Sequence, residues 1–300
     1  MTQSSVGQSP IGNRPSAIRS LPAYGWIGVL IVAVSETGML AHVEPFWSWH
    51  TPIAWTGYIL FVDAIVWQRR GESPLRNDRA ELAFLAIVSV PLWVVFEEYN
   101  KYTLHNWHYL NLPPVMIVRD VGYVWAFATI WPAIFETAEL VSALRDRRAP
   151  ADRRVQPRRV PLGIAGWGSV VAGAVMLIVP IVHPSPWLAA PVWLGFIFLL
   201  DPINAANGAE SLRGDFAAGH YGRLINLLIA GIVCGLVWEC WNYWAHTKWV
   251  YTVPVPPDIK LFEMPLAGYF GFPPFALECF TMYVFVRQGL WRGAWRPIAL

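Results

Sequence analysis

The chain has 300 residues, of which 55% are hydrophobic and only 14% are charged, and its mean hydropathy is +0.39. Charged residues make up about a quarter of an ordinary soluble domain, so this composition excludes a typical water-soluble protein and predicts an all-α, polytopic membrane helical bundle. The formal net charge of +2 hides an uneven distribution of arginine, which indicates orientation in a membrane and not a nucleic-acid partner.

Eight apolar segments follow one another along the chain after an N-terminal stretch, 1–20, that is rich in Ser, Gln and Gly and is expected to be disordered. A crossing needs about 20 residues. We place the spans near 21–43, 46–67, 80–102, 121–144, 162–182, 187–208, 224–246 and 266–288. The run from Leu21 is too long for the hydrophobic region of a cleaved signal peptide, so it counts as a retained span.

Arginine gathers in alternate loops, and this pattern predicts the topology. The Arg-rich parts are the N-terminus, 68–79, 145–161, the segment around Arg213, and the tail 289–300. The positive-inside rule then places both termini in the cytoplasm, as expected for a bacterial inner-membrane protein. The segment 145–161 is predicted to be a basic cytoplasmic linker that anchors the topology, with docking onto anionic lipid head groups as the functional alternative.

The two halves of the sequence match each other. A shift of 142 positions aligns FEEYN (96–100) with WECWN (238–242), and each of these stretches carries Glu-x-x-Asn on one helix face. The aligned pairs include Glu97 with Glu239, Asn100 with Asn242, Trp107 with Trp249, Tyr109 with Tyr251, and Glu136 with Glu278. A shift of 138 aligns 57–63 with 195–201. We therefore expect an internal duplication, with membrane repeats at 21–144 and 162–288 that hold four helices each and point the same way.

Aromatic residues are abundant, whereas the usual signatures of metal sites are missing. The 18 tryptophans and 11 tyrosines fit aromatic belts at the two membrane interfaces, or the lining of a pocket for a flat or apolar ligand. The three cysteines fit neither a disulfide framework nor a zinc site, and the histidines show no metal-binding spacing. No metal or other cofactor is predicted.

Acidic residues inside apolar segments are functional hypotheses by default, because burying them is costly. Glu97 and Glu239 lie toward the outer ends of their spans, and Glu136 and Glu278 lie deeper, each four residues after a proline. No Arg or Lys lies centrally in a span to neutralise them. If the halves pack face to face, the four carboxyl groups with Asn100 and Asn242 are expected to converge on one central cavity. The alternative is that each Glu bonds a neighbouring Asn, Trp or Tyr and holds the bundle together.

Two further acids, Asp63 and Asp201, lie at the cytoplasmic ends of their spans. We expect each to cap a helix or to pair with a loop arginine such as Arg69 or Arg213.

The run WNYWAHTKWVYTVP (241–254), followed by MPLAGYFGF (264–272), resembles the lycopene cyclase domain of the bacterial heterodimeric and fungal fused cyclases. In that family a Trp-Asp-Tyr element, a downstream aromatic pair and a Pro-x-Glu-Glu motif recur in two homologous membrane halves. Here Asn242 stands where the family has Asp, and residues 265–268 read Pro-Leu-Ala-Gly without either acid. The sequence also resembles a broader group of uncharacterised bacterial integral membrane proteins.

The resemblance implies metal-independent, acid-initiated chemistry on a carotenoid or other isoprenoid lipid, of the cyclase, isomerase or hydratase type. In this hypothesis Glu97 and Glu239 are the acid and base, Glu136 and Glu278 support them, Asn100 and Asn242 contact the ligand, and Trp107, Tyr109, Trp249 and Tyr251 close the outer mouth of the site. One alternative is a non-catalytic lipid- or pigment-binding subunit of a membrane protein complex. Another is a proton-coupled transporter. The expected partners are membrane lipids and an apolar isoprenoid or pigment.

Overall fold

The computed structural model describes residues 20–146, 157–254, 259–291, 293 and 295–298, so nearly all of the predicted disordered segment 1–20 and most of the predicted linker 145–161 lie outside it. The long helices of the described residues are α1 (Ala23–Leu40), α2 (Phe46–Arg70), α4 (Arg79–Tyr99), α5 (Met116–Arg145), α6 (Gly163–Val182), α7 (Ala189–Asn207), α9 (Gly222–Trp244) and α10 (Phe272–Leu290). The predicted all-α helical bundle is confirmed. Seven segments that contain these helices are long and apolar enough to cross a membrane; α2, which carries His50, Asp63 and Arg70, is the exception.

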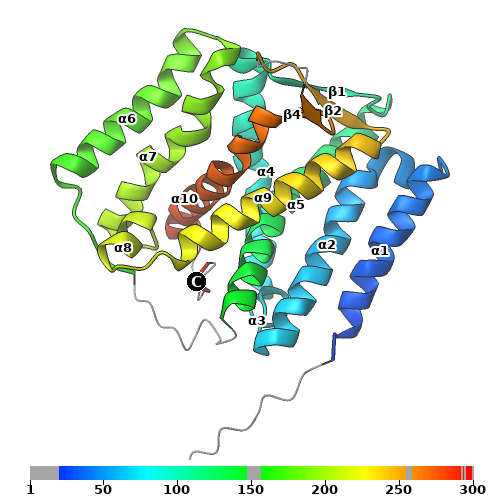
Figure 1. The fold of residues 1–300 in the computed structure, drawn as a ribbon, viewed down its shortest axis with the longest axis horizontal. Helices are drawn as coiled ribbons and strands as arrows, with labels where there is room; N and C mark the ends of the chain where they lie inside the picture. The colour runs from blue at the N-terminus through cyan, green and yellow to red at the C-terminus, as the bar shows by residue number, and fades with distance from the viewer. Residues whose placement is uncertain (1–19, 147–156, 255–258, 292, 294, 299–300) are drawn as a thin grey trace, which may run out of the picture.

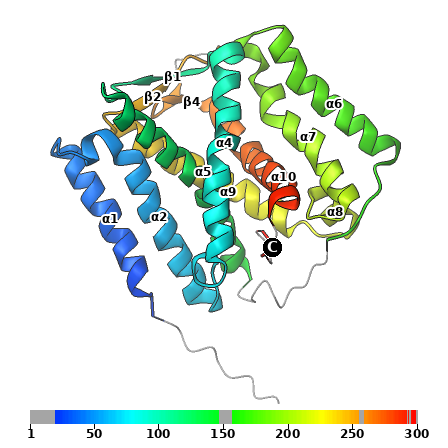
Figure 2. The same ribbon diagram turned by 180° about the vertical axis from the view of Figure 1, so that it is seen from behind.

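Four helices form the centre of the molecule and two helix pairs flank it (Figures 1 and 2). The central helices are α4, α5, α9 and α10, and α5 packs against α9. The pair α1 and α2 lies on one side, where α2 contacts α5, and the pair α6 and α7 lies on the other, where α7 contacts α10. Each half of the sequence therefore contributes one flanking pair and two central helices.

The predicted capping by Asp63 and Asp201 is confirmed. Asp63 Oδ2 accepts a hydrogen bond from the amide of Leu75 (2.8 Å) at the start of the short helix α3 (Pro74–Asn77). Asp201 accepts bonds from the amides of Leu212 (2.7 Å) and Arg213 (2.9 Å) at the start of α8 (Leu212–Ala217). Because the first amides of a helix have no partner within it, each aspartate fixes a short helix across the end of its own long helix.

The helices of each flanking pair approach closely at glycine. A Cβ atom on Gly28 of α1 would lie 2.5 Å from the carbonyl oxygen of Gly57 and 2.8 Å from the amide nitrogen of Phe61, both in α2. In the other pair, a Cβ atom on Gly173 of α6 would lie 2.4 Å from the amide nitrogen of Leu199 in α7. Small residues at these positions allow backbone-to-backbone packing of the kind that drives helix association in membranes.

This contact makes Gly28→Ala destabilising although alanine is the better helix former. We expect a loss of about 1 to 3 kcal/mol, because the new methyl group meets backbone atoms that cannot rotate away. Gly168→Ala in α6 is the matched control, since nothing lies within 4 Å of its Cβ position, and it should be neutral or slightly stabilising. Thermal unfolding of both purified variants, followed by tryptophan fluorescence, compares them; equal melting temperatures would contradict the proposed close contact.

At the end of the bundle that bears α3 and α8, which we call the tail end, buried acidic and basic side chains alternate. Arg287 of α10 bridges two acids, with Nη1 3.0 Å from Glu81 Oε1 and Nη2 2.5 Å from Glu210 Oε2. Arg223 of α9 bonds Glu210 as well, and its Nη1 lies 2.6 Å from Asp215 Oδ2. Each of these side chains is at least 90% buried. Together they tie α4, α9 and α10 to the segment before α8.

The C-terminal tail is part of this cluster. The amide of Arg296 donates to Glu81 Oε2 (2.8 Å), and the amide of Ile298 donates to Glu210 Oε1 (3.1 Å). Arg223 Nε donates to the carbonyl oxygen of Ile298 (2.9 Å). The basic tail was expected only as a topological signal, but its residues Arg296 and Ile298 bond Glu81 of one half and Glu210 of the other.

Glu139, an acid within the predicted span 121–144, has a buried cationic partner. Arg70, the last residue of α2, places Nη1 3.0 Å from Glu139 Oε2, and both side chains are buried. The expectation that acids within the spans lack cationic partners is therefore wrong for Glu139, and also for Glu81 of the predicted span 80–102, which is bonded to Arg287. The expectation failed because a basic residue near the end of one helix contacts an acid of a neighbouring helix in the folded bundle.

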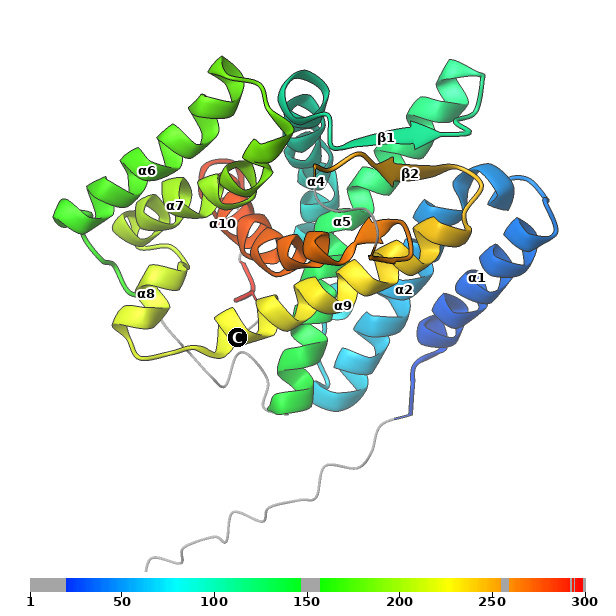
Figure 3. The ribbon, with the colours of Figure 1, turned by 45° about the horizontal axis from the view of Figure 1, so that its top comes forward.

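The opposite end, the strand end, carries a two-stranded antiparallel sheet. The strands are β1 (Trp107–Leu110) and β2 (Lys248–Tyr251), one from each half, and Figure 3 shows them lying across the helix ends. Trp107, Tyr109, Trp249 and Tyr251, which were expected to close the outer mouth of a site, belong to these strands. A smaller pair, β3 (Lys260–Leu261) and β4 (Met264–Pro265), precedes the 3-10 helix Leu266–Gly271.

Candidate functional site

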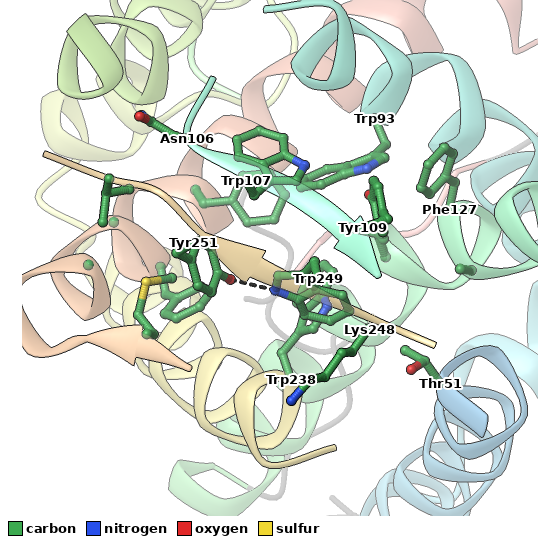
Figure 4. A pocket seen from close by; sticks show the side chains of 18 of the residues that line it. Thr51, Trp93, Asn106, Trp107, Tyr109, Phe127, Trp238, Lys248, Trp249 and Tyr251 are labelled. Atoms are coloured by element: carbon green, nitrogen blue, oxygen red, sulfur yellow. Dashed lines mark hydrogen bonds between the residues drawn. The ribbon is translucent and has the colours of Figure 1, made fainter. Parts of the chain in front are cut away.

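The sheet places four predicted site residues on one face. Trp107 pairs with Tyr251, and Tyr109 pairs with Trp249. Alternate residues of a strand point to the same side, so these four aromatic side chains share a face. All four line a partly open cavity of about 500 Å³, which we call the aromatic cavity. Figure 4 shows them gathered around it.

Aromatic side chains from both halves form a large part of the wall of the aromatic cavity. The tryptophans that line it are Trp49, Trp55, Trp93, Trp107, Trp187, Trp193, Trp238 and Trp249. They come from helices as well as from the strands, and Phe275 of α10 contacts the rings of Trp93, Trp193 and Trp238. The ring centroids are 5.6, 5.3 and 6.4 Å from that of Phe275, within the range of favourable aromatic pairs. Of the two roles expected for the tryptophans, lining a pocket is thus observed for this group.

Asn100 and Asn242 hold the strands in place. Asn100 Oδ1 accepts bonds from the amides of Asn106 (2.7 Å) and Trp107 (3.1 Å), and its Nδ2 donates to the carbonyl oxygen of Trp107 (2.8 Å). Asn242 Oδ1 accepts from the amide of Trp249 (2.9 Å), and its Nδ2 donates to the carbonyl oxygen of the same residue (2.8 Å). The side-chain amides of both residues thus form hydrogen bonds with the backbone in and next to the strands, and neither residue lines the aromatic cavity.

Glu97 and Glu239 lie behind the cavity wall and bind its tyrosines. Glu97 Oε1 accepts from the hydroxyl of Tyr109 (2.5 Å) and from Nε1 of Trp93 (2.8 Å). Glu239 Oε1 accepts from the hydroxyl of Tyr251 (2.6 Å), which itself accepts from Nε1 of Trp249 (2.7 Å). The same pair therefore occurs once in each half, with the tyrosine toward the cavity and the carboxyl group away from it.

The two tyrosines are hydrogen-bond donors. Burial, followed by the adjacent Glu97, raises the pKa of Tyr109 well above its ordinary value, and burial with Glu239 does the same for Tyr251. Both phenols stay neutral at physiological pH for this reason. Each phenol hydroxyl donates a hydrogen bond to its glutamate, so the phenol oxygen offers its lone pairs as acceptors.

Glu136 and Glu278 lie away from the aromatic cavity. Both are buried, at 1% and 0% exposure. Glu136 lines a small cavity of about 50 Å³ at the tail end together with Glu81, Glu139 and Arg296. Glu278 Oε1 accepts a bond from the amide of Phe196 in α7 (3.3 Å). The expected convergence of four carboxyl groups on one central cavity is wrong, since none of the four lines the aromatic cavity.

A second, polar pocket of about 730 Å³ adjoins the first at the strand end. It is lined by Glu97, Glu98, Lys101 and Arg119, among others. Tyr109 lines both this polar pocket and the aromatic cavity. The Tyr109 side chain thus lies between the two pockets, and Glu97 lies on the side of the polar pocket.

Several lining residues were not singled out from the sequence. Trp55 and Trp193 are the clearest examples, because the shift of 138 that aligns Gly57 with Gly195 also aligns them. Trp93 carried another signal, since it lies one helical turn before Glu97 and therefore on the same face. Trp238 and Phe275 carried no comparable signal; their place in the wall depends on how α9 and α10 cross.

Within the part of the chain that is described, no group of three or more His, Cys, Asp or Glu is arranged to hold a metal ion. Comparisons with protein-family models, with curated proteins and with solved structures found no match to this chain. The resemblance to the lycopene cyclase domain accordingly rests on the sequence motifs alone.

Proposed function

We propose that this chain is an integral membrane protein of two four-helix repeats, with both termini in the cytoplasm of a bacterial cell. The seven apolar segments support this, and so does the outer face of α6, where Ile164 (95% exposed), Val171, Val175 and Val182 form an exposed stripe. In water such a stripe would be a large apolar patch, whereas lipid chains cover it without cost. The matching Tyr109–Glu97 and Tyr251–Glu239 pairs and the Arg-rich loops support the repeats and the orientation.

The function that this geometry supports best is the binding of an isoprenoid or comparable apolar lipid in the aromatic cavity. The observation that carries the proposal is the cavity itself, a partly open space of about 500 Å³ whose surface is mainly apolar and carries many indole, phenol and phenyl rings. Pockets of this size with a mainly apolar and aromatic lining are typical of small-molecule binding sites. The flat faces of the rings suit a chain of conjugated or isolated double bonds.

Binding can be tested with deoxyretinol, a conjugated isoprenoid hydrocarbon that quenches tryptophan fluorescence. The purified protein in lipid nanodiscs should show saturable quenching by one ligand per chain. Ala126→Phe fills part of the aromatic cavity and should weaken binding roughly tenfold or more, since added bulk in a packed site is poorly tolerated. Val171→Phe on the exposed face of α6 is the matched control and should bind normally. Non-saturable quenching, or equal affinities for the two variants, would refute the proposal.

A second candidate function is acid-base catalysis on the bound isoprenoid, as a cyclase or isomerase. One observation favours it: two tyrosine hydroxyls line the cavity, and each is bonded to a buried glutamate. For this the Tyr109 hydroxyl turns from Glu97 toward the substrate, and a protonated Glu97 donates a proton to the Tyr109 oxygen as Tyr109 protonates an alkene carbon. Tyr251 then takes a proton from the resulting carbocation and passes its own to an ionised Glu239. The substrate is rearranged without net uptake of protons, and the cycle closes when Glu239 releases its proton to solvent and Glu97 takes one up.

Expression in cells that make lycopene or other polyprenyl lipids, followed by lipid analysis, tests the catalytic candidate. A new product that disappears in Tyr109→Phe and Tyr251→Phe would support it. Unchanged lipids across the panel, with deoxyretinol binding intact, would leave a binding protein without this activity.

A further inference from the structure

The aromatic cavity and the polar pocket share part of their lining. The residues common to both are Trp107, Tyr109, Leu112, Arg119, Tyr123 and Phe127. The ring centroid of Tyr123 lies 5.3 Å from that of Tyr109 and 5.6 Å from that of Phe127, so the three rings form a row. Figure 4 shows two of them, Tyr109 and Phe127, on the same side of the cavity. An aromatic space and a polar space therefore adjoin along this row.

The charged residues that line the aromatic cavity carry one sign of charge. They are Arg119 and Lys248, and among the described residues no Asp or Glu lines this cavity. Lys248 already has a partner, since its Nζ lies 2.5 Å from Glu263 Oε1. Arg119 is thus the cation that is left for a ligand.

The Arg119 guanidinium is weakly bound within the protein. Its Nε lies 3.6 Å from Asp120 Oδ1, which is too far for a hydrogen bond, and the guanidinium donates none to the described part of the chain. The two side chains are 37% and 55% exposed, and an exposed ion pair of this kind contributes little. Because Arg119 is partly exposed and borders both spaces, an oxygen of a ligand can reach it without displacing protein atoms.

We propose that the ligand of the aromatic cavity is an isoprenoid phosphate, with its hydrocarbon chain among the rings and its phosphate bound by Arg119 at the boundary with the polar pocket. This inference rests on the proposed binding function and specifies the class of ligand. A guanidinium presents paired N–H groups that match two phosphate oxygens. The remaining oxygen faces the polar pocket, where Lys101, His105 and His108 supply further donors.

The acids of the polar pocket fix where the phosphate lies. Glu97, Glu98 and Asp120 line this pocket and repel a phosphate, whereas none of the three lines the aromatic cavity. The position of lowest energy for the phosphate is therefore beside Arg119, on the side of the aromatic cavity. Asp120 competes with the ligand for the same guanidinium, so its removal should strengthen the binding of the phosphate.

The test compares retinyl phosphate with retinol, which share one polyene chain, by tryptophan quenching in phosphatidylcholine nanodiscs. Both affinities are corrected for partitioning into protein-free nanodiscs. Retinyl phosphate should bind roughly tenfold more tightly, the effect of a charge-assisted contact. Arg119→Gln should bring the ratio of the two affinities close to one and leave the affinity for retinol unchanged. Asp120→Asn should raise the ratio about twofold or more, since the guanidinium loses its competing partner.

Arg79→Gln is the matched control, because Arg79 is an exposed arginine at the tail end, and it should keep the ratio of the unaltered protein. A ratio of one or less in the unaltered protein overturns the inference, and so does a ratio that survives Arg119→Gln. The comparison in the unaltered protein decides the matter even if a variant fails to fold. If neither compound binds saturably, the proposed binding function itself fails, and the two failures are thereby distinguished.

Two further titrations identify the source of the phosphate. Millimolar inorganic phosphate should not displace retinyl phosphate, because the free ion gains nothing from the aromatic cavity. Nanodiscs that contain phosphatidylglycerol should preserve the preference for retinyl phosphate, since a lipid with two acyl chains does not fit among the rings. Displacement by inorganic phosphate would assign the site to the free ion, and loss of the preference in phosphatidylglycerol would assign it to a bulk lipid head group; either result overturns the inference.

Discussion

Arg287→Met should destabilise the protein by about 3 to 5 kcal/mol, the largest effect expected of a single substitution in this chain. The Arg287 guanidinium bonds Glu81 and Glu210, whose side chains are 9% and 3% exposed. Methionine fills a similar volume, but it leaves the buried carboxylate of Glu81 without a cationic partner. Removing one member of a buried ion pair costs far more than the pair itself contributes.

The measurement is chemical or thermal unfolding of the purified variant in a mild detergent. Arg119→Gln is the control, because Arg119 and Asp120 form an exposed pair 3.6 Å apart that should contribute no more than about 1 kcal/mol. Adding Glu81→Gln to Arg287→Met should recover part of the loss, since it removes the unpaired charge. A loss for Arg287→Met no greater than that for Arg119→Gln would show that the tail-end cluster does not hold the halves together.

Asn100→Leu should cost about 3 kcal/mol and should weaken ligand binding at the same time. The substitution removes three hydrogen bonds and leaves the buried amide of Asn106 and the backbone of Trp107 without their partner. Each buried group left unpaired costs roughly 1 to 3 kcal/mol, although relaxation of the strand recovers part of the sum. Trp107 and Tyr109 belong to this strand and line the aromatic cavity, so the loss of these hydrogen bonds also disorders part of the cavity wall.

Unfolding and deoxyretinol titration of the same Asn100→Leu preparation give both readouts. His108→Ala is the control: it lies between Trp107 and Tyr109 on the exposed side of β1 and should change stability by no more than about 0.5 kcal/mol. Normal stability and affinity in Asn100→Leu would mean that the strand is held by its pairing with β2 alone.

The helices could be predicted from the sequence because hydropathy and length are local properties. The predicted span 162–182 is within one residue of α6, and 187–208 is close to α7. The strands were missed because four-residue runs such as Trp107–Leu110 are too short for a clear periodicity. Their pairing joins positions from opposite halves, which no local pattern specifies.

The candidate site was predicted only in part, because the rest of it depends on tertiary structure. The alignment of the two halves identified Tyr109 and Tyr251 with their glutamates, because residue types repeated at a fixed shift mark equivalent positions. It could not tell that Glu97 lies behind Tyr109 while Glu136 lies near the tail end, since both are acids in apolar helices. That distinction depends on helix rotation and crossing, which follow from packing of the whole bundle.

The pairing of β1 with β2 also fixes when the site can exist during synthesis. Chains emerge from the ribosome N-terminus first, so α4, Trp107 and Tyr109 are synthesised before β2. The first strand then has no partner, and half of the aromatic wall is missing. The proposed ligand would find a complete cavity only after α9 and the strand that follows it have joined the bundle, which would make its binding a late step in the maturation of this protein.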